Sequence, residues 1–437
     1  MSIVRNIVIN FGSKILNLAL GICLSIISAR LLGPEGLGHI AFWGLIPAML
    51  ITFSDIGYDL SIVYRFSNNN NEEYKLIILN TFNVIFIFLS VLALIILLVF
   101  KKHIFDYNTS TLIIIMIAIM YYINLTQNTL VAYFKSREDY YTPNKMLTIS
   151  KIILLAISIM LLIFAGEIDY TSVYYIAIVA INSVICVYYY SVNVGFKLVK
   201  PKLSMLKPYY SYGFRIYFGA IAGFLILRLD MLMLKYMGTT EELGIYSIAV
   251  RLAEMLLLVS AASMVTMPGI IKGEVSKEKI AQIIRYLLFI TIMLSIAIAM
   301  LAQYLIVPLY GVEYKAVILL MQILLIGISI KSMNYAISPY IMGKGKPEYD
   351  SYLGVGIGIL NVLLNIVLIP RYGPIGAAVA TTISYVAGSI TYLIIFMKLT
   401  ELGIWTCILI SRKDFSYLIS IFSKQLTLMK NSINSVG

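Results

Sequence analysis

Nine ionisable residues lie inside long apolar segments of the chain, and their side chains are the ones whose chemistry needs an explanation. A charge near the centre of a bilayer costs at least about 2.5 kcal/mol on insertion scales, so such a residue usually faces a water-filled cavity or a partner. The cations are Lys14, Arg215, Arg228, Arg251 and Lys331, and the acids are Asp55, Asp59, Asp230 and Glu254.

One interpretation is structural: opposite charges pair and hold helices together. Arg251 and Glu254 are three residues apart on one helical face and can satisfy each other. Asp230 cannot face Arg228, which is two residues away, but it can reach Arg251 on a neighbouring helix. For these four residues the pairing and the functional interpretations stay equally open.

The functional interpretation is a cavity lined by cations that hold an anionic substrate. It suits Lys14, Arg215 and Lys331 best, because none of them has an acid within one turn of its own helix. An arginine would hold a phosphate through two hydrogen bonds, and a lysine would act as a point charge. All five cations are therefore candidate substrate-binding residues.

The acids have two possible roles of their own. Asp55 and Asp59 are four residues apart and would share a helical face. Two close carboxylates favour binding of a proton, so the acids, with Asp230 and Glu254, are candidates for coupling transport to a proton or sodium ion. Asp55 and Asp59 can equally neutralise Lys14, and we favour neutralisation.

The composition identifies the surroundings of these residues as lipid. Of the 437 residues 60% are hydrophobic and only 12% are charged, whereas soluble proteins carry about 25% charged residues. The net charge of +12 is spread over short clusters between apolar runs. This pattern is typical of membrane topology and excludes a continuous nucleic-acid-binding face.

Motifs for catalysis or metal binding are missing from the sequence. It contains no GxSxG, HExxH or CxxC motif and no Gly-rich phosphate loop, and its three cysteines are far apart. The loops between apolar segments are too short to hold a catalytic domain. We therefore expect a transporter rather than an enzyme, with no resident metal or cofactor.

The apolar segments predict an all-α integral membrane protein, because about 20 apolar residues cross a bilayer as a helix. Twelve spans are predicted at residues 7–32, 39–64, 76–100, 111–134, 146–165, 172–195, 210–236, 244–270, 284–307, 316–341, 352–370 and 374–397. Most Lys and Arg residues outside the spans fall on the side of the N-terminus, which predicts that both termini are cytoplasmic. Residues 401–437 mix aromatic and basic residues and predict an interfacial amphipathic tail.

An internal repeat divides the spans into two halves. Gly12-Ser13-Lys14 begins a span that ends in the Gly- and Glu-rich turn 32–38, and Gly213-Phe214-Arg215 begins one that ends in the turn 237–244. Six spans separate the two copies, so they share one orientation. The repeat predicts a six-helix lobe at 1–200 and another at 201–400.

Four motifs are distributed over almost the whole chain: residues 28–38 (SARLLGPEGLG), Asp55-Ile56-Gly57 with Arg65, residues 228–254 and residues 361–378. Together they resemble one family, the Wzx-type polysaccharide flippases of the multidrug/oligosaccharidyl-lipid/polysaccharide exporter superfamily. The first two motifs resemble the ends of its first and second helices. The third is similar to its seventh and eighth helices and the fourth to its eleventh-to-twelfth turn, so the motifs follow the expected order.

The resemblance implies two six-helix lobes around a central cavity. It also implies flipping of an undecaprenyl-diphosphate-linked oligosaccharide, an anionic lipid-linked partner, from the cytoplasmic to the outer leaflet by alternating access. Arg30 joins the candidate substrate-binding residues through the first motif alone. The implied location is the bacterial plasma (inner) membrane, in O-antigen, lipopolysaccharide or other polysaccharide biosynthesis alongside a polymerase.

Two alternatives remain. One is a cation-coupled, multidrug-type exporter of small molecules from the same superfamily, in which Asp55 and Asp59 would form the core of the ion site. The other is a membrane-embedded glycan polymerase or ligase, against which the short outside loops count.

Overall fold

The computed structural model describes residues 3–69, 71–106, 109–164, 169–197, 203–263, 269–270, 272–345, 347–411 and 414. These residues form helices joined by short turns. The helices are α1 (Ile3–Asp55), α2 (Tyr58–Ser67), α3 (Glu72–Val99), α4 (Lys101–Ile104), α5 (Thr111–Ser136), α6 (Tyr141–Ile163), α7 (Tyr170–Asn193), α8 (Leu203–Met237), α9 (Thr240–Glu254), α10 (Leu257–Ala262), α12 (Lys277–Tyr310), the 3-10 turn η2 (Val312–Tyr314), α13 (Ala316–Lys331), α14 (Asn334–Gly343), α15 (Pro347–Thr400) and α16 (Ile404–Ile408).

Two helices are long enough to cross a membrane twice. Both α1, with 53 residues, and α15, with 54, contain one non-helical glycine, Gly33 (φ 65°) and Gly373 (φ 53°). A proline follows each glycine at a position where a helix can begin. Each long helix is therefore two spans joined by a tight turn.

The predicted spans all correspond to helices. Within the described residues nine helices are long and apolar enough to cross a membrane. Two of them are the double spans above, and the 35-residue α8 supplies the remaining predicted span. The predicted multi-pass helical architecture is confirmed, whereas the cytoplasmic position of the termini and the lobe boundaries stay predictions.

Three spans are interrupted directly after an ionisable residue. The second span stops at Asp55, continues as α2 after Ile56 and Gly57, and both of these residues have positive φ angles (47° and 70°). The eighth span is interrupted after Glu254 and the tenth after Lys331. A non-helical stretch inside a span often marks a functional hinge.

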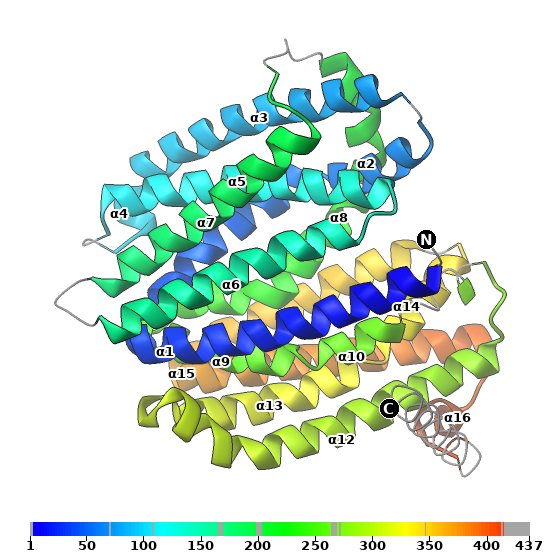
Figure 1. Ribbon diagram of the computed structural model, residues 1–437. Coiled ribbons are helices and arrows are strands. Elements are labelled where there is room, and N and C mark those ends of the chain that lie inside the picture. The colour runs from blue at the N-terminus through cyan, green and yellow to red at the C-terminus, as the bar shows by residue number, and fades with distance from the viewer. Residues whose placement is uncertain are drawn as a thin grey trace, which may run out of the picture.

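The helices form two lobes that are joined at one end. In Figure 1, α3, α5 and α7 lie in the upper half, α12 and α13 lie in the lower half, and α1 runs along the boundary. We call the end where α1 begins the terminal end, and the end with the Gly33 turn the turn end. On the expected orientation, the terminal end is cytoplasmic.

The hydrophobic cores explain why the lobes pack most closely at one end. One buried cluster contains residues of both lobes near the turn end, for example Ala29, Phe42 and Tyr310. Nearer the terminal end there are two separate cores, one around Tyr58 that includes Tyr209 at the start of α8, and one around Ile280. Apolar packing therefore joins the lobes most extensively at the turn end, whereas at the terminal end the cores are separate and the start of α8 packs into the first of them.

A reciprocal glycine contact seals the turn end. A Cβ atom on Gly38 would overlap the Thr240 carbonyl oxygen, and a Cβ atom on Gly244 would overlap the Pro34 carbonyl oxygen. Gly38 lies four residues after Pro34, which Gly244 touches, and Gly244 lies four residues after Thr240, which Gly38 touches. The two predicted repeat segments therefore meet across a local two-fold axis. Only glycine allows the two backbones to approach so closely.

Polar contacts reinforce this seal. The Lys235 ammonium, 9% exposed, donates to Asp106 Oδ2 at 2.7 Å and to Thr240 Oγ1 at 3.0 Å. It also lies 5.3 Å from the ring centre of Phe42. Because Asp106 and Phe42 belong to one lobe and Lys235 to the other, this ion pair ties the lobes together. Neither Lys235 nor Asp106 was among the residues predicted to be functional.

Little of the predicted amphipathic tail lies within the described residues. Its first part, α16, packs against α12, and Asp414 is bound by Arg285 through Nε at 2.8 Å and Nη2 at 3.1 Å. Gln282 donates to the same carboxylate at 2.9 Å. The start of the tail is therefore fastened to one lobe. Residues 412–413 and 415–437 lie outside the described part.

The glycine seal predicts the effect of adding one methyl group. Gly38→Ala and Gly244→Ala should each destabilise the protein by about 1–3 kcal/mol, because the new Cβ atom must displace a backbone carbonyl. Thermal unfolding in detergent measures this loss. Gly12→Ala is the matched control, since a Cβ there has no neighbour within 4 Å. Equal unfolding temperatures for all three variants would contradict the reciprocal contact.

Candidate substrate cavity

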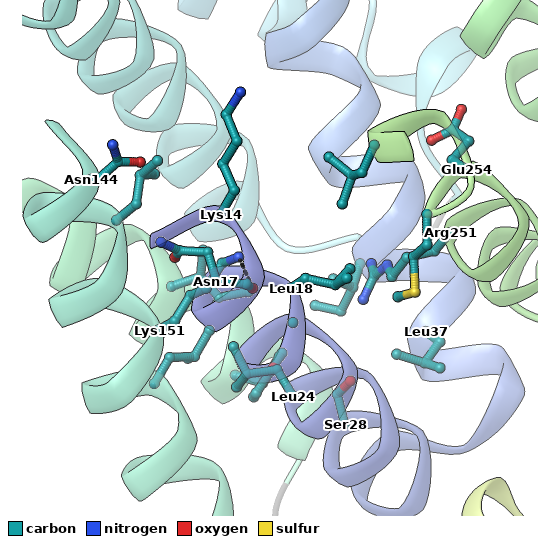
Figure 2. Close-up of a pocket in the computed structure, with 18 residues that line it drawn as sticks. Lys14, Asn17, Leu18, Leu24, Ser28, Leu37, Asn144, Lys151, Arg251 and Glu254 are labelled. Atoms are coloured by element: carbon teal, nitrogen blue, oxygen red, sulfur yellow. Dashed lines mark hydrogen bonds between the residues drawn. The ribbon is translucent and has the colours of Figure 1, made fainter. Parts of the chain in front are cut away.

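A cavity of about 660 Å³ lies between the lobes, on the terminal side of the shared core. Residues of the first half of α1 and of α6 line one side, and residues of α9 and α10 line the other. The cavity follows from the packing described above, because the lobes have separate cores at this depth. Its lining is largely apolar, with a few polar and charged side chains (Figure 2).

Three cations line this cavity: Lys14, Lys151 and Arg251. Figure 2 shows Lys14 and Lys151 on one side of the open space and Arg251 across from them. Lys14 and Arg251 are exposed, and no ion pair within the described residues includes any of the three. Three cations without paired acids form a site suited to an anion with several negative oxygens.

Lys151 is held in place by the first span. Its ammonium donates to the Asn17 carbonyl oxygen at 2.7 Å, and the Asn17 side chain donates to Ser13 O and Thr148 Oγ1, both at 2.9 Å. The Asn17 Oδ1 atom is buried without a hydrogen-bond partner among the described residues. This oxygen is therefore an unsatisfied acceptor beside the cavity wall.

A second compartment of about 360 Å³ continues from the first, since Arg251 and Glu254 line both. Asn124 and Ser247 add polar groups to its wall. Arg228 also lines it and donates to Glu254 through Nη1 at 2.8 Å and Nη2 at 3.0 Å. The cavity therefore runs from a basic region near Lys14 to a two-pronged Arg–Glu pair deeper between the lobes.

Of the pairings that the sequence left open, the structure does not form the one between Arg251 and Glu254. The Glu254 carboxylate faces Arg228 on the neighbouring helix α8, and Figure 2 shows it turned away from the Arg251 guanidinium. The planar fork of Arg228 matches both carboxylate oxygens, which a partner three residues along the same helix cannot do as well. Arg251 is consequently available in the cavity.

Asp230 also has partners other than the predicted Arg251. Its Oδ2 atom accepts from Tyr246 Oη at 2.5 Å and from Thr381 Oγ1 at 3.0 Å, and its Oδ1 atom accepts from Met231 N at 2.7 Å. Asn361 and Asn365 extend this chain of hydrogen bonds. The fully buried carboxylate therefore sits in a cluster of neutral oxygen-bearing groups inside one lobe.

Asp55 and Asp59 do not neutralise Lys14, because no ion pair joins them to it in the described structure. They also do not share a continuous helical face, since the break at Ile56 and Gly57 separates them. Asp55 Oδ1 is buried without a hydrogen-bond partner in the described part of the chain. The preference for neutralisation is therefore wrong, and ion coupling at Asp55 stays a prediction.

Lys331 lies in a different cavity from Lys14 and Arg251. It lines a small space of about 210 Å³ inside the lobe of α8, α13 and α15, with Asn334 and Asp350. Its ammonium lies 3.8 Å from the ring centre of Tyr385, a cation–π contact, and forms no ion pair with a described residue. The prediction that Lys331 lines the same cavity as Lys14 is wrong.

The two remaining candidates are Arg30 and Arg215. Arg30 donates to Pro308 O at 2.6 Å and to Leu309 O at 2.9 Å, so it connects α1 to α12 at the turn end instead of lining the cavity. The side chain of Arg215 lies outside the described residues. Its assignment to the cavity stays a prediction.

Lys151 and Asn17 were not among the residues predicted to line the cavity, although Lys151 has a recognisable pattern around it. Asn144, Thr148 and Lys151 are spaced by four and three residues, which places three polar side chains on one face of an otherwise apolar span. Because Lys151 follows the basic residues Arg137 and Lys145, the sequence alone favours a role in orienting the chain.

Comparison with family models places the chain in the polysaccharide biosynthesis protein family. The model of the polysaccharide biosynthesis protein family matches residues 3–274. The probable flippase AglR of Haloferax volcanii is 28% identical over 212 residues, which are 46% of this chain and 44% of AglR. The chain thus spans less than half the length of this relative.

Solved structures show the same fold. The lipid II flippase MurJ, in an inward closed conformation, matches with a TM-score of 0.71 and 16% identity over 97% of this chain and 100% of that chain. A multidrug resistance MATE family transporter of the MOP superfamily, in an inward-facing conformation, has a TM-score of 0.68 and 12% identity over 88% of this chain and 94% of the other. The predicted fold, with two lobes of six helices, is confirmed.

The hydrogen bonds of Asp230 predict a stability effect. Tyr246→Phe removes one donor from a buried carboxylate and should cost about 1.5–3 kcal/mol, the usual value for a hydrogen bond to a charged group. Tyr352→Phe, at a side chain 74% exposed, is the matched control and should leave stability unchanged. Thermal unfolding of both variants checks this. A Tyr246→Phe protein as stable as the control would show that the bond contributes nothing.

Proposed function

Since the chain belongs to the polysaccharide biosynthesis protein family, we propose that it flips an undecaprenyl-diphosphate-linked oligosaccharide from the cytoplasmic to the outer leaflet of a bacterial plasma membrane. The observation that carries the proposal is the cavity at the terminal end with three cations, Lys14, Lys151 and Arg251, that form no ion pair with any residue the structure describes. A diphosphate needs such cations to leave water for the membrane interior.

Alternating access follows from the two ends of the molecule. The turn end is sealed by Gly38, Gly244 and the Lys235–Asp106 pair, and the cavity lies on the other side of that seal. A substrate would enter the cavity from the terminal side. Separation of the lobes at the turn end, with closure at the terminal end, would then expose it to the opposite leaflet.

In this proposal the two compartments bind different parts of the substrate. The basic region holds the diphosphate, and the second compartment, with Asn124 and Ser247, receives sugar hydroxyls. The lipid tail stays in the bilayer beside the lobes.

Two acids within the predicted spans, Asp230 and Asp55, are candidate binding sites for an ion that drives this transport. Asp230 has only neutral groups as direct partners, and Asp55 has a buried oxygen without a partner among the described residues. A proton or sodium ion bound at either carboxylate would neutralise a charge that the bilayer disfavours. Unfolding temperatures in sodium and in potassium salts at several pH values, for the protein and for Asp230→Asn and Asp55→Asn, test each site.

A cation-coupled exporter of small molecules is the second candidate function. The buried acids and the similarity to a MATE-type transporter favour it. Deleting the gene distinguishes the two functions: a flippase defect leaves lipid-linked glycan on the cytoplasmic side with drug sensitivity unchanged. Altered drug tolerance without glycan accumulation would support the exporter instead. The family and the flippases and transporters that it resembles give no support to a polymerase or ligase.

Single charge removals test the cavity. Lys14→Ala, Lys151→Met and Arg251→Ala should each weaken binding of the lipid-linked diphosphate roughly 10- to 100-fold, because each loses a charged hydrogen bond of about 1.5–3 kcal/mol. Glycan accumulation in complemented cells, at equal membrane levels of protein, measures the loss. Lys145→Met is the control, since this exposed lysine lies on α6 outside the cavity lining. Full export by all three variants would disprove the assignment.

A further inference from the structure

The Arg228–Glu254 pair stands between two charged surroundings. On one side is the substrate cavity, where Arg251 has no acid partner among the described residues. On the other side is Lys331, which lines the small cavity inside one lobe and interacts electrostatically with Glu254, Arg228 and Asp230. The helices that carry Glu254 and Lys331, α9 and α13, pack against each other. Glu254 therefore has a second cation on a helix packed against its own, and it binds Arg228 in this structure.

Lys331 lacks the compensation that a buried cation normally requires. It has no carboxylate within ion-pair distance among the described residues, and its ammonium rests on the Tyr385 ring. Asp350, which lines the same small cavity, already accepts a hydrogen bond from Tyr392 at 2.7 Å. A cation–π contact replaces only part of the interaction that a carboxylate would provide. The Lys331 ammonium can therefore form a salt bridge with a carboxylate that comes within reach.

An anion entering the cavity competes for Arg228. Arg228 binds both oxygens of Glu254 with the two-pronged geometry that also suits a phosphate. If a phosphate took this place without any other change, Glu254 would be left as an uncompensated charge between the lobes, which is costly. Transfer of the carboxylate to Lys331 removes that cost, because every charge then has a partner.

The backbone is interrupted where this transfer would act. Glu254 is the last residue of α9 and Lys331 the last residue of α13. Directly after each of them the backbone forms a 3-10-type hydrogen bond, between residues three apart instead of four. These bonds run from Leu256 N to Ala253 O and from Met333 N to Ile330 O. Met255 and Leu258, at and after the first interruption, line the substrate cavity. A movement of α10 therefore changes the cavity directly.

From these contacts we propose that Arg228, Glu254 and Lys331 form a switch in which Glu254 exchanges one salt-bridge partner for another. Binding of an anionic substrate group to Arg228 releases Glu254 to Lys331, and the new pair draws the ends of α9 and α13 together and moves α10 and α14 toward closure of the terminal end. The inference rests on the proposed function and adds one step to it: the diphosphate, held first in the basic region, passes by way of Arg251, which lines both compartments, to Arg228 in the second compartment. Glu254 and Lys331 are positioning residues in this switch and need not touch the substrate.

The test uses the full chain in nanodiscs with inorganic pyrophosphate as the probe. Spin labels at Lys145→Cys on α6 and Lys344→Cys after α14, both exposed positions at the terminal end, report the distance between the lobes. The three native cysteines are replaced by alanine in this background. Pyrophosphate should bind and shorten the distance between the labels.

Variants on the two sides of the switch should behave in opposite ways. Lys331→Met should weaken pyrophosphate binding about fivefold or more, the usual lower range for coupling between sites, and abolish the shortening even at saturation. Glu254→Gln should tighten binding, since Arg228 loses its competitor, and should also abolish the shortening. Tighter binding cannot come from a misfolded protein, so this variant keeps the test valid.

Lys151→Met is the matched control inside the cavity. It should weaken binding but keep the full shortening once pyrophosphate saturates the protein, because the switch is intact. If Lys331→Met or Glu254→Gln shortens the distance as the unmodified protein does, the switch is disproved and the proposed function stands. If the unmodified protein binds no pyrophosphate, the diphosphate site fails and the switch fails with it.

Discussion

A charged side chain within a bilayer must find an opposite charge, hydrogen-bond partners or water, and the placement of the ionisable residues in this protein follows from that constraint. Asp230 is surrounded by hydroxyl and amide groups. Arg228 and Glu254 bind each other through two hydrogen bonds. Lys14, Lys151 and Arg251 instead face the cavity, where water or a ligand can compensate them. The cavity is therefore the place where charged side chains lack an opposite charge or a full set of hydrogen bonds from the described part of the protein.

The difference in packing between the two ends of the molecule determines at which end the cavity lies. At the turn end both lobes contribute to one apolar core, and glycine backbones touch without intervening side chains. At the terminal end the cores around Tyr58 and around Ile280 are separate, although the start of α8 packs into the first of them, so the surfaces between the lobes can be lined by polar groups. A protein with equal packing at both ends would leave no room for a substrate between its lobes.

The sequence was sufficient to predict the spans and to locate the two repeat segments, whereas their contact is visible only in the structure. Long apolar runs determine how many helices cross the membrane, and the Gly- and Glu-rich turns at 32–38 and 237–244 are the segments that meet at the seal. The partners of the charges could not be predicted in the same way. Glu254 binds Arg228 and not Arg251 because the relative position of α8 and α9 decides the pairing, and sequence spacing along one helix does not contain that position.

Two further residues show the same limit. Lys331 looked equivalent to Lys14 because both are isolated cations in apolar runs, but helix packing places Lys331 inside one lobe and Lys14 between the lobes. Lys151 looked like a topological signal because it follows other basic residues, although its polar neighbours Asn144 and Thr148 share its face. In both cases the three-dimensional surroundings, and not the residue type, determine the role.

The seal at the turn end also determines how the protein responds to the salt around a cell. Its glycine contact carries no net charge, and the Lys235 ammonium is buried while only the Asp106 carboxylate is half exposed (47%). Dissolved ions weaken exposed charges strongly and buried or uncharged contacts very little. On the expected orientation this end faces the outside medium, so the closed state keeps nearly the same stability in dilute and in saline surroundings.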